Sequence, residues 1–272
     1  MMSKKTFFYS FCSFLLSPIY KFYYNPKIIG KDNLKVSGAK VIVGNHIHLF
    51  DQCNIIISTK EFITFMAKKE YFDSLKTSWF FKSVGCISVD RSKHDEKSKK
   101  SALEVLNSSS PIGIFPEGTR NSVKESFAIF LYKEYGIKTD LKEFIKRMKY
   151  VKKSQIDKMI NLLNSELITL EDFKNNILDP DKYLISLVKQ NIITESEYYD
   201  SYILEFKFGA VSMAKKKDAY LIPIGITGNY KFRSNDLTIR IGKPFKIADM
   251  DLEEANQFLR KKVIELIKEN LN

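Results

Sequence analysis

Two of the chain's three histidines lie close to an aspartate in the segment VGNHIHLFDQ. His46, His48 and Asp51 are residue types that can bind a metal ion or move a proton. As metal ligands they form H-x-H-x-x-D, one residue away from the H-x-H-x-D-H pattern of metallo-hydrolases. Such a site needs further ligands, and the chain offers only His94, in a highly charged segment, with no cysteine pair or glutamate-rich cluster. The pattern therefore favours proton transfer over metal binding.

The spacing of His46 and Asp51, H-x4-D, suits a general base with an orienting carboxylate. If the chain turns into a helix near Leu49, Asp51 can fold back and accept a hydrogen bond from one imidazole nitrogen. The other nitrogen can then take a proton from a substrate hydroxyl, which is worth about 10²- to 10⁴-fold in rate. His48 has no acid at the same offset, because Cys53 occupies that position. The same spacing also arises by chance, so a third interpretation stays open, in which the segment is simply a helix start that contains histidine.

The FPEGTRN segment combines groups that suit a phosphate. Gly118 allows close backbone approach, Thr119 adds a hydroxyl, and Arg120 offers a bidentate guanidinium. Arg91, at the end of CISVDR, can supply a second cation from a neighbouring strand. In the alternative interpretation, Glu117 and Arg120 simply form an ion pair with each other.

These groups follow short β-branched segments that are predicted strands. The six segments, each bounded by turn signals, are 41–45, 62–67, 86–90, 112–118, 220–228 and 237–242. Stretches of helical character such as 92–107 separate most of them, so the pattern predicts an α/β fold with a largely parallel sheet. Reactive groups of such a sheet gather at the carboxyl ends of its strands. Residues 249–270 predict a closing amphipathic helix capped by Asp251.

Residues 124–202 depart from this pattern and predict a separate helical subdomain. They contain almost no strand-like run, and thirteen basic residues balance thirteen acidic ones. Within them, 159–178 repeats as 184–203, at a period of 25 residues. Each copy places a threonine three residues before an acid, as Thr169 and Asp172 do in the first copy, which is a capping box. Each copy therefore predicts an apolar helix, a short turn and a second, capped helix.

The composition is that of a globular protein with anionic partners. The 272 residues are 44% apolar and 28% charged, enough to bury a sizeable core. The net charge is +12, and all of it lies outside 124–202. Such a charge suits an anionic partner, which can be nucleic acid, an acidic membrane surface or a phosphorylated substrate. Compositional bias can account for part of the charge. The widely spaced Cys12, Cys53 and Cys86 predict buried thiols in a reducing compartment and no disulfide.

Residues 1–24 predict a helix that lies on a membrane surface. An apolar, aromatic-rich stretch runs from residue 6 to 16, where Ser17-Pro18 ends it, and it is far shorter than the roughly 20 residues of a spanning helix. Tyr and Phe occupy the region where a secretory signal needs small residues. The basic residues expected to face anionic headgroups are Lys4, Lys5 and Lys21. The alternative is a helix packed on the protein's own core.

Four segments together resemble the motif blocks of the glycerolipid acyltransferases, in particular the lysophosphatidic acid acyltransferases. NHIHLFD, GCISVDR, IFPEGTRN and LIPIGITG occur in the family's order and at roughly its spacing, and MAKKEYF, FKFGA and the closing helix are also similar. The resemblance covers about residues 25–123 and 203–270, and H-x4-D together with FPEGTR is a specific combination. It implies a mostly parallel sheet flanked by helices, built from 25–123 and 203–272 around the insertion 124–202.

The resemblance also implies an O-acyltransferase that converts lysophosphatidic acid to phosphatidic acid in phospholipid biosynthesis. His46 is then the general base for the glycerol hydroxyl and Asp51 orients it, while the acyl group comes directly from acyl-CoA or acyl-acyl carrier protein. The Pro223 segment is implied to line the acyl-donor side. The residues implied to bind the acceptor are Arg91, Glu117, Gly118, Thr119, Arg120 and Lys68.

The implied setting is the cytoplasmic side of the cell membrane, with the protein peripheral or monotopic on an anionic surface. No cofactor, metal or nucleic acid is expected, and the chain shows no RNP-like strand or recognition-helix signature. Two other functions stay open. One is acylation of glycerol-3-phosphate or another lysophospholipid, and the other is a non-catalytic module that binds lipid at the membrane surface.

The sequence departs from the family pattern in two places. His48 occupies a position that is usually small and polar, where it can tune His46 or merely cap the helix. The insertion follows FPEGTRN directly, so it can cover the site, recognise a carrier protein or mediate self-association. Its basic part, 142–158, carries a net +5, which suits an acidic carrier protein or an anionic membrane, or forms a solvated helix face.

Overall fold

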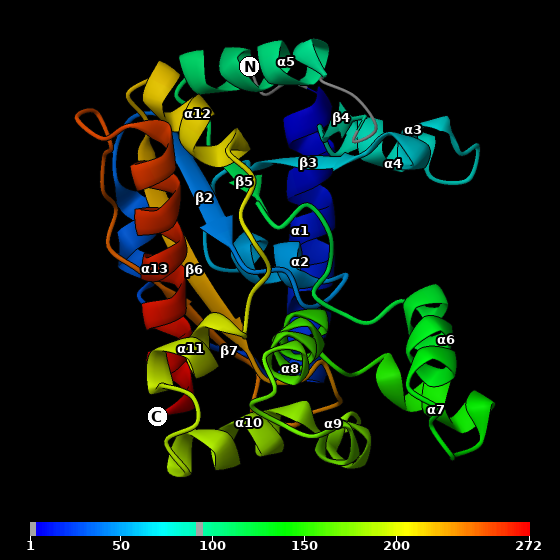
Figure 1. Ribbon diagram of the computed structural model, residues 1–272. Coiled ribbons are helices and arrows are strands. Elements are labelled where there is room, and N and C mark those ends of the chain that lie inside the picture. Colours follow the sequence, from blue (N-terminus) through cyan, green and yellow to red (C-terminus); the bar gives the residue numbers. More distant parts are fainter. Residues whose placement is uncertain (1–3, 91–94) are drawn as a thin grey trace. The chain divides into compact units, whose positions relative to one another are not determined.

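The computed structural model describes residues 4–90 and 95–272, with side chains described from residue 7 onward. The chain divides into two compact units (Figure 1). The first joins Met1–Gly118 to Phe206–Asn272, and the second is Thr119–Glu205. The second unit contains the whole segment 124–202 that the sequence predicts as an insertion.

A seven-stranded sheet forms the centre of the first unit, in the order β1-β7-β6-β2-β5-β3-β4. Neighbouring strands run parallel, except that β6 and β7 are antiparallel. The strands are β1 (Lys27–Ile29), β2 (Lys40–Gly44), β3 (Thr64–Lys68), β4 (Ile87–Val89), β5 (Ile112–Ile114), β6 (Tyr220–Thr227) and β7 (Thr238–Ile241). The α/β class is thereby confirmed, and six strands overlap the predicted segments. The sequence analysis did not predict β1, which pairs in parallel with β7.

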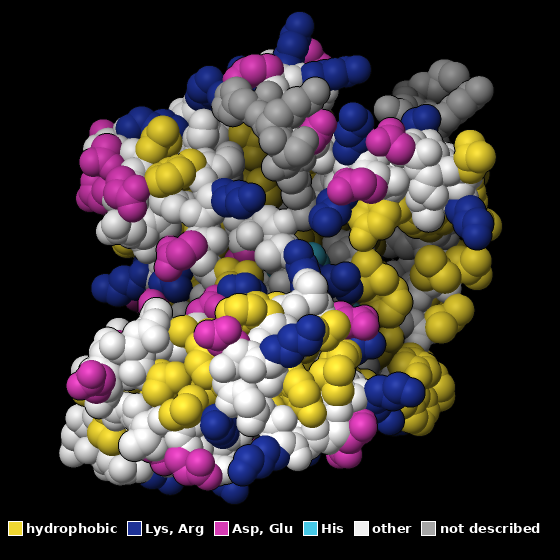
Figure 2. Space-filling model, turned by 45° about the vertical axis from the view of Figure 1, so that its right-hand side comes forward, with side chains coloured by type: hydrophobic (Ala, Val, Ile, Leu, Met, Phe, Trp, Pro, Cys, Tyr) yellow, Lys and Arg dark blue, Asp and Glu magenta, His cyan; other side chains and the backbone are white. Residues whose placement is uncertain are grey.

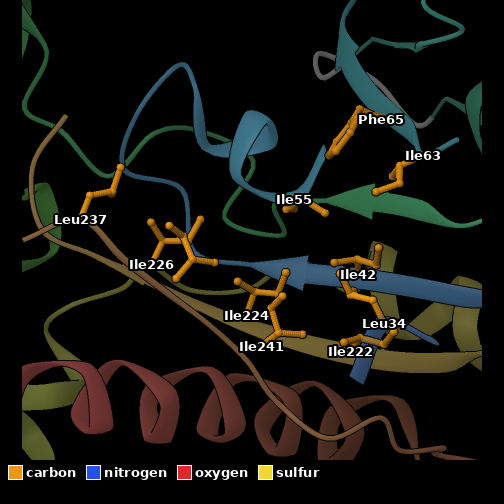
Figure 3. Close-up of a cluster of buried hydrophobic side chains, with 11 residues drawn as sticks. Leu34, Ile42, Ile55, Ile63, Phe65, Ile222, Ile224, Ile226, Leu237 and Ile241 are labelled. Atoms are coloured by element: carbon orange, nitrogen blue, oxygen red, sulfur yellow. The ribbon is translucent and has the colours of Figure 1, made fainter. Parts of the chain in front are cut away.

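Both faces of the sheet are covered, which explains why β2 is a continuous apolar run with every residue buried. Ile42 points to one face, where Figure 3 shows it in a cluster with residues of β6, β7 and α2 (Asp51–Ile56). On the other face α13 (Leu252–Leu271) packs against β6. Gly225 makes that contact possible, because a Cβ there would lie 2.8 Å from the Cβ of Leu266. Strands β2 and β6 are therefore buried between two packed layers.

The remaining helices of the first unit connect these strands. They are η1 (Lys31–Lys35), α3 (Lys69–Asp73), α4 (Ser78–Ser83), α5 (Glu96–Asn107) and α12 (Gly209–Lys216). The predicted helix at 92–107 is α5, whose first residue follows the capping residue Asp95. Asp251 caps α13 as expected, since its carboxylate accepts from the backbone N–H of Glu254 at 2.8 Å.

Helix α1 (Lys4–Tyr24) is longer than the apolar stretch that the sequence indicated. Pro18 lies inside the helix and does not end it. A proline in a helix interior removes one backbone hydrogen bond, but the residues that follow are held by packing. The rings of Tyr20 and Tyr24 both contact Phe50, next to α2. Tertiary contact thus extends the helix past the position where local propensity would stop it.

The second unit is entirely helical in the part of the chain that the structure describes. Its helices are α6 (Glu125–Glu134), α7 (Leu141–Met148), α8 (Lys153–Asn164), α9 (Leu170–Asn176), α10 (Pro180–Lys189) and α11 (Glu195–Asp200). The two repeat copies form α8–α9 and α10–α11, and both predicted capping boxes are present. Glu166 and Asn191, 25 positions apart, both have a positive φ in the turn between the helices of their copy. The repeat in the sequence is therefore a repeat in the backbone.

Asn121, the last residue of FPEGTRN, holds the two ends of the second unit together. Its amide donates to the Ser154 hydroxyl at 2.7 Å and to the backbone carbonyl of Tyr202 at 2.9 Å, and its oxygen accepts from the Ser154 N–H. Asn121 and Ser154 are both buried. The backbone that follows Arg120 is consequently fixed to the start of α8 and the end of α11.

Candidate active site

The loop between β2 and α2 wraps around the carboxylate of Asp51. Asp51 Oδ2 accepts hydrogen bonds from His46 Nδ1 at 2.7 Å, from the Ile47 N–H at 2.7 Å and from the His48 N–H at 2.8 Å. The carboxylate is fully buried, whereas 19% of the His46 side chain remains accessible. Because a carboxylate only accepts, Nδ1 of a neutral His46 carries the proton and Nε2 keeps a free electron pair. The H-x4-D spacing thus yields an oriented imidazole that can accept a proton.

The carboxyl end of β5 supports His46 from a second direction. Phe115 stacks on the imidazole with ring centroids 4.5 Å apart. Glu117, which is buried, accepts a hydrogen bond from the backbone N–H of His46 at 2.6 Å. Directly after β2, the side chain of Asn45 donates to the carbonyl of Ile226 in β6 and accepts from its N–H. Glu117, one of the residues predicted to bind the acceptor, therefore contacts the backbone of the base.

His48 lies beside the pair and shapes the loop. Its backbone N–H donates to Asp51, its Nδ1 accepts from the Phe50 N–H at 3.3 Å, and its ring stacks on Tyr230 at 4.1 Å. His48 thus lies in the turn before α2, whose capping residue is Phe50.

The sequence did not indicate Tyr230, which contacts the other oxygen of Asp51. Its hydroxyl donates to Asp51 Oδ1 at 2.5 Å and accepts from Asn54 Nδ2 at 2.6 Å. Burial first, and then the charge of Asp51, raise the pKa of Tyr230 well above its usual range, so the hydroxyl stays a donor. The only local signal is a tyrosine two positions after ITG at the end of β6.

Lys207 is a second residue that the sequence analysis missed. Its backbone N–H donates to the carbonyl of Pro116 at 3.0 Å, and its side chain crosses Gly118. Gly118 has φ +69°, and a Cβ there would lie 3.0 Å from Lys207 Cε. Glycine therefore allows both the turn and the close approach of an exposed ammonium group. The FKFGA segment contained this lysine, but nothing in its sequence showed that it faces FPEG.

The other residues that the sequence singled out lie elsewhere in the chain or outside the described part. Thr119 and Arg120 follow Gly118 directly and belong to the second unit. Lys68 ends β3, and none of its described contacts reaches His46 or Asp51. Arg91 and His94 fall outside the described residues. Pro223 lies in the middle of β6, where it is buried.

Two alternative chemistries find little support in the described residues. Burial raises the pKa of the Cys53 thiol to about 12, so this cysteine is a poor nucleophile despite its place in α2. Within residues 4–90 and 95–272, no three His, Cys, Asp or Glu side chains come together as a possible metal site. The arrangement at the end of β2 is that of a base oriented by a carboxylate.

Comparison with known proteins shows which family the chain belongs to. Residues 25–227 match the family model described as Acyltransferase. Over 115 residues the chain is 31% identical to the 1-acyl-sn-glycerol-3-phosphate acyltransferase of Bacillus subtilis (strain 168), which is 42% of this chain and 58% of that protein's length. The 1-acyl-sn-glycerophosphate (LPA) acyltransferase PlsC from Thermotoga maritima shares the fold, with a TM-score of 0.53 and 16% identity over 97% of this chain and 94% of that one. Since the family match covers well over half of its residues, the chain belongs to the acyltransferase family.

Proposed function

We propose that this protein transfers an acyl group from a thioester donor to the free hydroxyl of lysophosphatidate, forming phosphatidate. The observation that carries the proposal is the hydrogen bond between His46 Nδ1 and Asp51, which leaves Nε2 as a base, in a chain that belongs to the acyltransferase family. The donor is acyl-CoA or acyl-acyl carrier protein.

In the proposed reaction, His46 Nε2 takes the proton of the acceptor hydroxyl as its oxygen attacks the thioester carbonyl. The new C–O bond gives a tetrahedral intermediate, which collapses as the C–S bond breaks. The departing thiolate takes the proton back from His46, so the enzyme returns to its starting state. Asp51 keeps the imidazole in the required tautomer and stabilises the imidazolium while it exists. No metal or cofactor takes part in this sequence.

The phosphate of the acceptor is proposed to bind at the FPEGTR loop. Lys207 brings an ammonium group over Gly118, and Arg120 follows two residues later in the chain. Cations paired with glycine backbone N–H groups are a common way to bind phosphate. Arg91 is proposed to add a further positive charge on the basis of the sequence alone.

A membrane surface is proposed as the place of reaction, because α1 exposes a large apolar face. Its exposed hydrophobic residues are Phe7, Phe11, Phe14, Leu15, Leu16, Ile19, Phe22 and Tyr23. Trp79 of α4 contacts Phe8, and Phe232 contacts Phe22, so the apolar surface continues at both ends of the helix. Figure 2 shows hydrophobic side chains gathered along the right-hand side of that view. None of the described helices has the length and hydropathy to cross a membrane.

This apolar surface suits a helix that lies in the membrane interface. One stripe of α1 packs on the protein, as the alternative interpretation of the N-terminal segment expects, and the exposed side chains support the proposed membrane contact. Acyl-CoA and acyl carrier protein are cytoplasmic donors, which supports the cytoplasmic side of the cell membrane as its place.

The basic surface of α7 supports acyl carrier protein as one of the donors. Lys142, Lys146 and Arg147 line an open depression on the second unit, together with Glu143 and Tyr150. An acidic carrier protein is attracted to such a surface. This part of the proposal predicts a salt-sensitive KM for the carrier-protein donor and a weaker salt effect with acyl-CoA.

The proposal is tested by a panel of acceptors and donors with the purified full-length protein. Labelled palmitoyl-CoA and palmitoyl-acyl carrier protein are each offered with lysophosphatidate, glycerol-3-phosphate or lysophosphatidylcholine. We expect the highest kcat/KM with lysophosphatidate, and labelled phosphatidate as product. Preferred turnover of glycerol-3-phosphate would reassign the acceptor, and no transfer to any acceptor would leave a lipid-binding module as the function.

A further inference from the structure

We infer that a chain of three hydrogen bonds running from helix α1 positions the catalytic pair at the end of β2. Tyr20 of α1 bonds to Asn54, Asn54 bonds to Tyr230, and Tyr230 bonds to Asp51. Helix α1 is then a working part of the acyl-transfer site as well as a surface helix. The inference rests on the function proposed above for His46.

The direction of each hydrogen bond is fixed by the one before it. The Asp51 carboxylate only accepts, so the Tyr230 hydroxyl must donate to Oδ1, at 2.5 Å. The oxygen of Tyr230 is then an acceptor, and Asn54 must turn its NH₂ group toward it, at 2.6 Å. That orientation leaves Asn54 Oδ1 to accept from the Tyr20 hydroxyl, at 2.7 Å. The chain therefore has one consistent arrangement.

Burial makes the loss of any link costly. The side chains of Asp51 and Asn54 are fully buried, so water cannot replace a missing partner there. Without the Tyr20 hydroxyl, Asn54 Oδ1 loses its hydrogen-bond partner, and the bond to Tyr230 alone then holds the amide. A less firmly held amide loosens Tyr230, which is one of the four donors that hold Asp51.

The same contacts connect the dyad to the exposed helix. On α1, Tyr20 faces Asn54, while Ile19 and Phe22 are exposed on other sides of the helix. The ring of Tyr20 also contacts Phe50, in the loop that surrounds Asp51. A displacement of α1 therefore acts on the groups that orient His46, without any contact between α1 and the substrate being needed.

Removing single hydroxyl groups tests this chain in the full-length protein. The variants are Tyr20→Phe, Tyr230→Phe and the double variant, and Tyr24→Phe is the matched control. Tyr24 lies on the same helix, and its ring touches Phe50 and Tyr230. Among the described residues its hydroxyl has no hydrogen-bond partner. Assays use a short-chain lysophosphatidate below its micelle concentration and no vesicles, so that anchoring at a membrane does not affect the rate.

We expect kcat to fall about tenfold in Tyr230→Phe and about threefold or more in Tyr20→Phe, as the loss of one or part of one hydrogen bond predicts. The KM for the acceptor should change by less than about twofold, because these groups do not touch it. The double variant should be within about twofold of Tyr230→Phe, because both changes break one chain. Tyr24→Phe should match the wild type.

Any other pattern overturns the inference. If Tyr20→Phe behaves like Tyr24→Phe, helix α1 does not act on the dyad, and multiplicative losses in the double variant would show two independent structural effects. Should Tyr230→Phe fail to fold, the comparison of Tyr20→Phe with Tyr24→Phe decides alone.

A second measurement separates this inference from the proposed function. If the wild type transfers no acyl group, the function proposed for His46 is wrong, and the chain is then tested by the NMR resonance of the His46 Nδ1 proton bound to Asp51. That resonance should shift in Tyr20→Phe and stay in place in Tyr24→Phe. An unchanged resonance in both variants would reject the chain as a positioning device.

Discussion

The two nitrogens of His46 face different surroundings, and this difference is the basis of the proposed chemistry. Nδ1 is bound to a buried carboxylate that also holds the backbone N–H groups of Ile47 and His48. Glu117 fixes the backbone of His46 itself, and Phe115 covers one face of the ring. The imidazole is thus held by its neighbours on several sides and keeps Nε2 for a substrate.

At the same scale, Lys207 is predicted to bind the acceptor phosphate. Lys207→Met should raise the KM for lysophosphatidate about tenfold and leave kcat within about twofold, since a phosphate contact is made equally in the ground and transition states. Lys216→Met is the matched control, because Lys216 is also exposed and lies at the end of α12. Steady-state kinetics with varied acceptor measure both effects. Equal KM values in the two variants would place the phosphate elsewhere.

Sequence spacing found the residues of the site that are neighbours along the chain and missed those that come together only in the fold. His46 and Asp51 are five positions apart and were identified from their types. Tyr230 is 179 positions from Asp51, and residues 119–205 separate Lys207 from Gly118 in the sequence. The chain is rich in tyrosine and lysine, so the sequence does not show which of these residues makes such a contact.

At the scale of elements, the patterns of apolar residues in the sequence predicted most strands and the closing helix correctly. The β-branched runs and the turn signals that bound them were strong in β2, β5 and β6, because these strands are buried in the sheet. Helix α1 continues past Pro18, where the apolar stretch ends in the sequence, because Tyr20 and Tyr24 make tertiary contacts with Phe50. Local propensity sets the ends of helices only where packing does not override it.

The capping box at the start of α11 makes a prediction about pH. A hydrogen bond from Lys158 first, and then bonds from Thr194, lower the pKa of Glu197 from 4.5 to about 2. Because the folded chain holds the charged form more firmly than the unfolded chain, the contribution of Glu197 to stability is present above about pH 4.5 and is lost as the pH falls toward about 2. Glu197→Gln should therefore lower stability at pH 7, by less than about 1 kcal/mol because Glu197 is exposed.

Urea unfolding at several pH values measures this contribution. The gap between wild type and Glu197→Gln should close as the pH falls. Asp172→Asn is the comparison in the first repeat copy, where Thr169 gives the same cap and no lysine is among the described contacts. We expect a smaller gap there, whereas a gap for Glu197→Gln that does not change with pH would contradict the assignment.

At the scale of the whole molecule, the exposed hydrophobic side chains are the feature with the most direct functional meaning. A surface of this kind is unusual in a protein that has no partner for it. Phe11→Ser should lower the binding of the protein to anionic lipid vesicles by about tenfold, because a phenylalanine that enters the interface contributes about 1.5–3 kcal/mol. Phe130→Ser is the control, since Phe130 is 50% exposed and Phe11 54%. Sedimentation with vesicles measures the binding, and equal loss in both variants would remove α1 from the proposed membrane surface.

The central claim is that His46 accepts the proton of the acceptor hydroxyl. Its most direct test is the rate of phosphatidate formation by His46→Gln, with both substrates saturating and with thermal unfolding monitored to show that the fold is kept. We predict that kcat falls by about 10²- to 10⁴-fold, because glutamine can hold a substrate hydroxyl but cannot take its proton. A variant that retains more than about a third of the wild-type kcat would contradict the assignment of the base.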